Sequence, residues 1–267
     1  MYKVTYFAKK GKNYIIKISG NELENEYLIS EDLVIEYRLL LGKTFDFNQN
    51  NKLIEAINKD KYYQKVLNYS LFKPRTKKEI FTYLSKLKVE DYGYYITKLE
   101  RMKLVNDNLY AQNYISDAIN LKRFGTKKII EDLKLKGIAP EVISNYLSSY
   151  SHQLKIENIQ YWVEKKIKIT KNKPYLQIKK IVTSFLLNKG FDYQDINIVL
   201  NNNQEKIKSE LNEEEAIVKE INYLKIKYSK KEQKLSLQQF LTNKLLAKGF
   251  QYGTIKKYLE RSQLGDE

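Results

Sequence analysis

The chain has 267 residues, 42% of them hydrophobic, which is enough apolar material to bury one large core or several small ones. It contains no cysteine, which excludes a disulfide framework and a cysteine-based zinc site and is consistent with a reducing compartment. The formal net charge of +16 favours acidic partners such as nucleic acid, an anionic membrane or an acidic protein groove, although Lys-rich, Arg-poor composition also follows from A·T-rich coding.

The first segment of the chain is predicted to be a small β-rich cap. Alternating runs "KVTYFA" and "YIIKIS" are joined by the turn-rich "KKGKN", and "EYLIS" forms a third short run. Ser30 is a predicted N-cap, followed by first-turn acids, for a helix "DLVIEYRLLL" that Gly42 ends. This cap ends near Phe47, and everything beyond it has helical apolar spacing with few prolines.

Beyond the cap, one sequence pattern recurs around three Lys-Gly pairs. Gly137, Gly190 and Gly249 lie 53 and 59 residues apart. Apolar residues stand four and eight positions before each glycine, and one, six and ten positions after it. Offsets of four are the helical period, so one helix ends at each glycine and another begins about three residues later.

The glycine itself has a conformational explanation. A helix that closes with a residue at positive φ prefers glycine there, and the apolar residue that follows covers the last turn. The preceding Lys136, Lys189 and Lys248 suit the negative end of a helix. A weaker copy of the unit lies upstream, where Lys88 stands at the glycine position. A further amphipathic run precedes each pair, which makes the unit a bundle of three helices.

The predicted fold is therefore mainly α: an elongated, curved array of tandem three-helix repeats preceded by a small N-terminal β-rich cap. The predicted domains are the cap at 1–47 and four helical repeats at 48–106, 107–150, 151–206 and 207–267.

Three stretches resemble the RecX family of RecA regulators: "PRTKKEIFTYLSKL", "LERMKLVNDNLYAQNYI" and "RFGTKKIIEDLKLKGIAPEVISNYL". The family pattern of apolar, acidic and aromatic-Ala positions is filled by Leu99, Met102, Leu104, Val105, Asp107, Tyr110 and Ala111. Two positions depart from it, since Lys103 replaces the usual Gly and Asn106 replaces the first acid. The resemblance covers about Tyr69 to Tyr150, and the later repeats match by pattern.

This resemblance implies a non-enzymatic regulator that lies in the groove of a RecA–DNA filament and blocks its growth or promotes its disassembly, which would modulate recombination, DNA repair and the SOS response. The expected partners are the RecA filament and single- and double-stranded DNA, bound without sequence preference, and the chain is expected to be a monomer. Neither composition nor spacing shows RecA binding.

Basic residues gather near the link between the first and second helices of two repeats. Their shared location predicts a basic stripe, which helix N-termini facing phosphate could reinforce. The rival reading is chance clustering in a Lys-rich chain, and a further run at Lys225, Lys227, Lys230, Lys231 and Lys234 is interpreted as a solvated linker. The predicted contacts, the first four of which are expected to be exposed, are Lys122, Arg123, Lys127, Lys128, Lys165, Lys166, Lys168, Lys171 and Lys173.

Other conspicuous residues have structural explanations. The tyrosines could stack on exposed bases, but Tyr146 and Tyr258 share a repeat position with Val199, which favours half-buried packing. Trp162 is predicted to pack between helices, and His152 to be a surface residue. The acidic run Glu213 to Glu215 is expected to open a helix.

No nucleotide, zinc or nucleophile motif occurs, so we expect no enzyme, cofactor or metal. No run of 18 apolar residues and no apolar leader occurs, so the chain is expected to be unprocessed, cytoplasmic and free of membrane contact. Two other functions stay open: a DNA-binding protein that acts without RecA, and a helical scaffold for an unrelated protein. Against the first, "PEVISNYLSS" and "YQDINIVLNN" lack the basic residues of a groove-reading helix.

Overall fold

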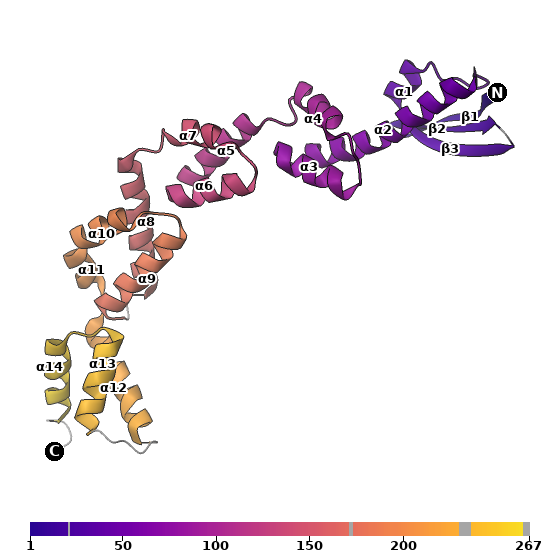
Figure 1. The fold of residues 1–267 in the computed structure, drawn as a ribbon. Helices are drawn as coiled ribbons and strands as arrows, with labels where there is room; N and C mark the ends of the chain where they lie inside the picture. Colours follow the sequence, from indigo (N-terminus) through magenta and orange to yellow (C-terminus); the bar gives the residue numbers. More distant parts are fainter. Residues whose placement is uncertain (21, 171–172, 230–235, 264–267) are drawn as a thin grey trace. The chain divides into compact units, whose positions relative to one another are not determined.

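The computed structural model describes residues 1–20, 22–170, 173–229 and 236–263. It confirms a mainly helical chain behind a small N-terminal antiparallel sheet. The chain divides into two compact units: unit 1 holds residues 1–111 and 136–138, and unit 2 holds residues 112–135 and 139–267. Figure 1 gives the order of the helices and strands in each unit.

Unit 1 begins with the predicted sheet. Strands β1 (Tyr2–Lys10), β2 (Asn13–Gly20) and β3 (Leu23–Ser30) pair in sequence, and a short β4 (Thr44–Phe45) that the sequence did not predict pairs with β1. The resulting antiparallel order is β3-β2-β1-β4. The face that carries Val4 and Ile16 packs against Leu53 and Ile57 of the following long helix.

Helix α1 (Glu31–Glu36) is shorter than predicted. Ser30 caps it as expected, because its hydroxyl accepts a hydrogen bond from the Leu33 amide. The predicted continuation to Leu41 is wrong: Arg38 adopts a φ of 47°, and the chain turns so that Leu39 is fully buried in the cap's core. Burying Leu39 is thus achieved by breaking the helix rather than by extending it.

Helix α2 (Phe47–Phe72) contributes to two cores in unit 1. Its first half covers the sheet, while Tyr63 and Val66 in its second half pack with α3 (Lys77–Lys86) and α4 (Tyr92–Arg101). These three helices form what we call repeat 1. Helix α5 (Asp107–Asn120) follows and runs from unit 1 into unit 2.

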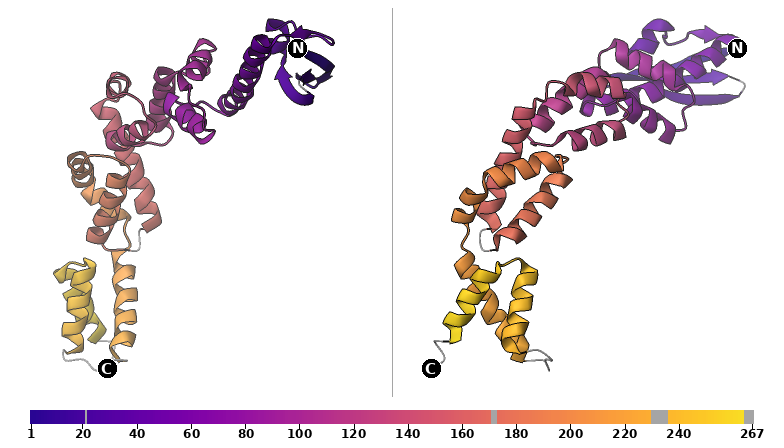
Figure 2. Two further views of the ribbon diagram at one scale, coloured as in Figure 1. Left: turned by 45° about the vertical axis from the view of Figure 1, so that its right-hand side comes forward. Right: turned by 60° about the vertical axis from the view of Figure 1, so that its left-hand side comes forward.

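Unit 2 contains the remaining helices, which repeat the same arrangement. Repeat 2 comprises α5, α6 (Thr126–Leu135) and α7 (Pro140–Leu147). Repeat 3 comprises α8 (His152–Thr170), α9 (Tyr175–Asn188) and α10 (Tyr193–Asn202), followed by a short α11 (Gln204–Glu210) that the sequence did not predict. Repeat 4 comprises α12 (Glu213–Ser229), α13 (Leu237–Lys248) and α14 (Tyr252–Gln263), which lie side by side in both views of Figure 2.

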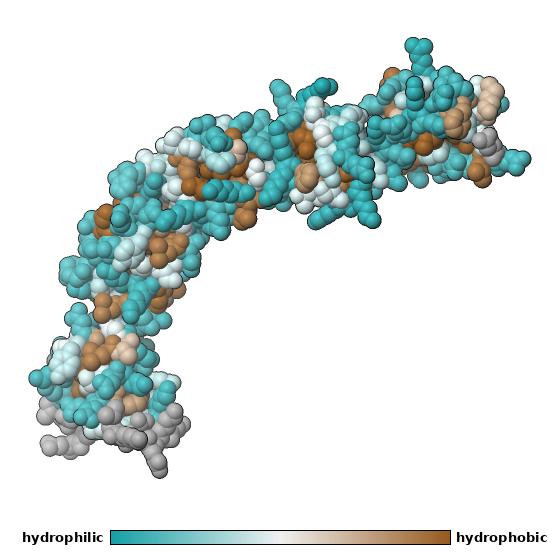
Figure 3. All heavy atoms as spheres, in the orientation of Figure 1, coloured by the Kyte–Doolittle hydropathy of each residue, from teal (hydrophilic) through white to brown (hydrophobic). Residues whose placement is uncertain are grey.

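Repeats 3 and 4 each have a separate apolar core. Ile159, Val182 and Ile196 belong to the first, and Ile217, Leu241 and Ile255 to the second. Hydrophilic residues cover most of the face that Figure 3 shows, with hydrophobic residues visible between them. Lys225 and Lys227 lie within α12, so interpreting them as a linker was wrong; Lys230, Lys231 and Lys234 lie outside the described residues.

The glycine turns have the predicted backbone. Gly137, Gly190 and Gly249 have φ values of 80°, 88° and 93°. Lys88, at the same position of repeat 1, also has a positive φ of 56°, and Lys103, at the position where the family has Gly, has a φ of 58°. The backbone turn is therefore retained where the glycine is not.

The structure gives the glycines a second role that the sequence did not reveal. Each glycine turn lies against the beginning of the second helix of the preceding repeat: a Cβ on Gly137 would press on Lys78, one on Gly190 would overlap the backbone of Lys128, and one on Gly249 would come within 3.2 Å of Leu176. The Lys88 turn follows no earlier three-helix repeat, and the Lys88 side chain is exposed. Of these four turns, the three that lie against a preceding repeat carry glycine, and the one that does not carries lysine.

Candidate nucleic-acid interface

The first predicted basic cluster lies at the α5–α6 link and in the first turn of α6. Arg123 has a φ of 50°, its guanidinium donates a hydrogen bond to Asn158 at 2.8 Å, and it lies 4.1 Å from the centre of the Tyr161 ring. Its carbonyl oxygen accepts a hydrogen bond from the Trp162 indole at 2.9 Å. Arg123 therefore fastens repeat 2 to repeat 3 and is half-buried, which contradicts the expectation that it is exposed.

Lys127 and Lys128 are also engaged within the protein. The Lys127 ammonium lies 2.8 Å from Asp192, and the Lys128 ammonium lies 2.7 Å from Asp132. Lys128 is half-buried rather than exposed, whereas Lys127 is exposed as expected. Burial opposes ionisation of Asp132, but hydrogen bonds from Lys128 and Tyr114 outweigh it and lower its pKa. Both lysines thus have part of their charge neutralised locally.

Lys122 is the member of this cluster that projects without a carboxylate partner among the described residues. It is exposed, and its ammonium lies 4.8 Å from the centre of the Tyr114 ring and 5.9 Å from that of Phe124. Lys122 thus lies next to aromatic rings, as do two lysines of the second predicted cluster.

The second cluster lies mainly on α8 rather than in a link. Lys165, Lys166 and Lys168 are in the last turns of this helix, Lys173 precedes α9, and Lys171 lies outside the described residues. The Lys165 ammonium is 5.3 Å from the centre of a Trp162 ring, and the Lys166 ammonium is 4.1 Å from that of Phe185. Trp162 and Phe185 meet edge to face, with ring centres 5.2 Å apart.

One lysine of this surface, Lys189, was missed by the sequence analysis. Its ammonium lies 4.7 Å from the ring centre of Phe124, 4.6 Å from that of Trp162 and 5.5 Å from that of Phe185. Burial lowers the pKa of Lys189, and repulsion from Lys166 and Lys165 lowers it further. We call Lys122, Lys165, Lys166 and Lys189 the lysine platform, because they surround one set of three aromatic rings.

The lysines that precede the other two glycines behave differently. Lys136 pairs with Glu79 at 2.7 Å, and Lys248 pairs with Glu220 at 2.6 Å. At the same repeat position Lys189 has aromatic neighbours instead and forms no ion pair with a described residue. The repeat alignment placed Lys189 correctly, but the three rings of Phe124, Trp162 and Phe185 and the lack of an ion pair distinguish it from its equivalents.

The helix N-termini that were expected to face phosphate are used inside the protein. The first-turn amide of Lys77 in α3 donates to Asp107 at 2.9 Å, and that of Tyr175 in α9 donates to Glu213. At α6, the Gly125 amide donates to the Lys189 carbonyl at 2.8 Å. Each acceptor comes from the following repeat. These amides are therefore not available to an external phosphate.

The remaining singled-out residues are structural. Tyr146 and Tyr258 are half-buried as predicted, and Trp162 packs between helices, also as predicted. His152 is at the surface, with its imidazole 3.1 Å from Asp195. Glu213 opens α12 as expected, but its carboxylate also caps α9. Within the described ranges, no three potential ligands gather to hold a metal ion, and no helix is long and apolar enough to cross a bilayer.

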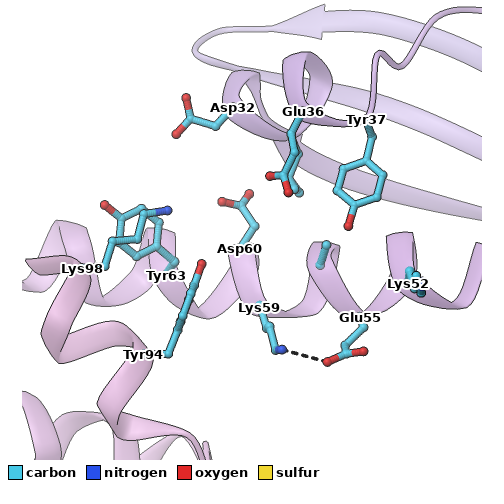
Figure 4. Close-up of a pocket in the computed structure, with 12 residues that line it drawn as sticks. Asp32, Glu36, Tyr37, Lys52, Glu55, Lys59, Asp60, Tyr63, Tyr94 and Lys98 are labelled. Carbon is cyan, nitrogen blue, oxygen red and sulfur yellow. Dashed lines mark ion pairs between the residues drawn. The ribbon is translucent and has the colours of Figure 1, made fainter. Parts of the chain in front are cut away.

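A recess of about 300 Å³ in unit 1 has a different character (Figure 4). Asp32 and Glu36 from α1 face Asp60 on α2 and Lys98 on α4. The Asp60 carboxylate accepts hydrogen bonds from the Ser30 amide and the Gln64 side chain, both at 3.2 Å. Four carboxylates and three lysines line the recess, so its charges nearly balance and it adds little to the basic surface.

The fold defines a helical-repeat protein, and its second and third repeats carry a surface of lysines next to aromatic rings. Residues 106–147 match the model of the RecX second three-helix domain. The chain is 32% identical over 264 residues to the regulatory protein RecX of Streptococcus agalactiae serotype V, covering 96% of this chain and 98% of that one. It is 29% identical over 276 residues to regulatory protein RecX of Enterococcus faecalis, covering 99% and 98%.

A solved structure supports the fold. The crystal structure of a regulatory protein RecX aligns with a TM-score of 0.59 at 22% identity, covering 75% of this chain and all of that one. The chain belongs to the RecX family of regulatory proteins.

Proposed function

We propose that this protein binds the RecA–DNA filament and inhibits the recombinase, either by blocking filament extension or by promoting disassembly, and that it thereby modulates recombination and DNA repair. The observation that carries the proposal is membership of the RecX family along nearly the whole chain. The net charge of +16 and the lysine platform support a nucleoprotein partner, because both attract phosphate.

The alternative is sequence-indifferent DNA binding that does not involve RecA. The platform consists of lysines, which neutralise phosphate as point charges without reading bases. Helices α7 and α10, the third helices of repeats 2 and 3, contain no Lys or Arg, so neither has the composition of a groove-reading helix. This alternative predicts DNA binding with no effect on RecA.

The test is DNA-dependent ATP hydrolysis by RecA on single-stranded DNA, with this protein added well below the RecA concentration. We expect hydrolysis to fall and filaments to shorten, because each bound molecule would block or break a filament that contains many RecA subunits. Unchanged hydrolysis and unchanged filament length would contradict the proposal and favour the alternative.

Replacing all of Lys122, Arg123, Lys127 and Lys128 by Ala would be a poor probe of the contact surface. Arg123 and Lys127 bind repeat 3 directly, so their loss would disturb the docking of the repeats. Lys122 is exposed and has no ion pair with a described residue, so Lys122→Gln is the variant of this group that removes a charge without breaking an ion pair.

A further inference from the structure

The lysine platform concentrates positive charge that no ion pair with a described carboxylate neutralises. None of its four ammonium groups forms an ion pair with a carboxylate in the part of the chain that the structure describes. By contrast, the neighbouring Lys127 and Lys128 pair with acids, as do Lys136 and Lys248 at the repeat position of Lys189. The ammonium groups repel one another, and that of Lys189 is partly buried. An external anion would relieve the repulsion and would therefore bind favourably to the platform.

The aromatic rings bring the four ammonium groups into one surface. Lys122 and Lys189 share the Phe124 ring. Lys165 and Lys189 share Trp162, while Lys166 and Lys189 share Phe185. The rings come from the α5–α6 link, α8 and α9, and the Trp162 indole is fixed by its bond to Arg123. Docking of repeat 3 on repeat 2 thus assembles the platform.

The same geometry decides which part of a nucleic acid fits. Bases would need free ring faces on which to stack, and these rings already have ammonium groups next to them. Phosphodiester groups need only positive charge within reach, and several of them in a row match several lysines on one surface. An acidic protein segment is the competing occupant, which the charge alone would also attract.

We propose that the lysine platform of Lys122, Lys165, Lys166 and Lys189 is a binding site for consecutive phosphates of a nucleic-acid strand. The choice of nucleic acid over an acidic protein rests on the proposed function. The site sits across the junction of repeats 2 and 3 and contacts the backbone without recognising bases.

The experiment compares two variants with equal loss of charge in the full chain. The platform variant carries Lys122→Gln, Lys165→Gln, Lys166→Gln and Lys189→Gln. The control variant carries the same change at four ion-paired lysines, Lys208, Lys219, Lys256 and Lys257. Circular dichroism and thermal melting first establish that both are folded. Binding of a labelled oligothymidylate is then measured by fluorescence anisotropy over a range of salt concentrations.

For the platform variant we expect the slope of log affinity against log salt to become less negative by about 3, because roughly 0.7 of a counterion is released per phosphate on a single strand. The control should change the slope by less than half as much. Oligoadenylate should bind the unsubstituted protein as oligothymidylate does. A methylphosphonate oligonucleotide, whose backbone is neutral, should not compete.

Three results would overturn the proposal: no salt-dependent binding by the unsubstituted protein, equal slopes for the two variants, or competition by polyglutamate as strong as that by the oligonucleotide. Failure of the proposed function is a separate outcome. If the unsubstituted protein leaves ATP hydrolysis by RecA unchanged while the platform variant loses salt-dependent DNA binding, the phosphate site is supported and the proposed inhibition of RecA is contradicted.

Discussion

At the scale of single residues, two glycines let the backbones of repeats 2 and 3 come into close contact. A Cβ on Gly125 would overlap the backbone of Gly190, and a Cβ on Gly190 would overlap that of Lys128. The Gly125 amide also donates a hydrogen bond to the Lys189 carbonyl at 2.8 Å. Side chains are absent here so that backbone can meet backbone, and the contact places Lys189 beside Phe124.

Gly190→Ala should therefore destabilise the protein more than Gly249→Ala. Both changes put a Cβ on a left-handed backbone, at a cost of about 1–2 kcal/mol. At Gly249 the added carbon meets the Leu176 side chain at 3.2 Å, whereas at Gly190 it overlaps main-chain atoms that cannot move aside. Urea denaturation of both variants measures the difference. Equal losses would mean that docking tolerates the extra carbon.

Sequence reasoning predicted the positive φ of these glycines but not the contact. The 53- and 59-residue spacing and the apolar positions around each pair required a helix end, and a helix end of this kind requires a left-handed residue. The repeat that lies against the glycine is distant in sequence and leaves no local pattern. For the same reason Lys189 was interpreted as a helix-end charge, since its rings come from residues 4 to 65 positions away.

At the scale of helices, the repeats are linked by polar contacts at the start of α3, α6 and α9. In unit 1, the Thr76 hydroxyl donates to the Lys136 carbonyl at 2.8 Å, and the Lys136 ammonium bonds Glu79. Burial opposes ionisation of Glu79, but hydrogen bonds from Lys136 and the Thr76 amide outweigh it and hold its pKa below the ordinary value. The charged carboxylate therefore stabilises the folded state.

The stability difference between the unsubstituted protein and Glu79→Gln should depend on pH. Because the pKa of Glu79 is lower in the folded state than in the unfolded state, the ionised carboxylate stabilises the fold at neutral pH. This stabilisation is lost as the pH falls below the unfolded-state pKa of about 4.3 and then through the lower folded-state pKa. Gln retains the capping geometry but loses the charge that pairs with Lys136. Denaturation midpoints across acidic pH provide the measurement, and a difference that stays constant with pH would contradict the assignment.

Helix boundaries were predicted well wherever local signals decide them. Ser30 caps α1 as expected, because a hydroxyl and first-turn acids act within a few residues. The end of α1 was wrong because Leu39 is drawn into a core built partly from α2, which no local signal reports. The short β4 was missed for the same reason, since its pairing partner lies at the opposite end of the cap.

At the scale of the whole molecule, the apolar cores of repeats 3 and 4 have no residue in common. Stability of such arrays is approximately a sum of repeat and nearest-neighbour terms. Loss of one repeat should therefore weaken its neighbour locally without unfolding it.

A chain ended after Leu211 tests this expectation. Repeats 2 and 3 should stay folded, as circular dichroism would show. The Tyr175 amide and the first turn of α9 should exchange hydrogen faster, because Glu213 and the Gly249 turn are gone. Glu213→Gln in the full chain is the matched control and should accelerate the same amide less. Loss of helicity throughout α8–α10 would show that the repeats are not modular.

The contacts between repeats all have the same direction along the chain. At the start of α3, α6 and α9 an amide donates to an acceptor from the next repeat, and α3 also has a capping box of its own, as α13 does. A unit inserted into the array would therefore need a glycine turn that fits the second helix of the repeat before it, and a second helix that accepts the turn of the repeat after it.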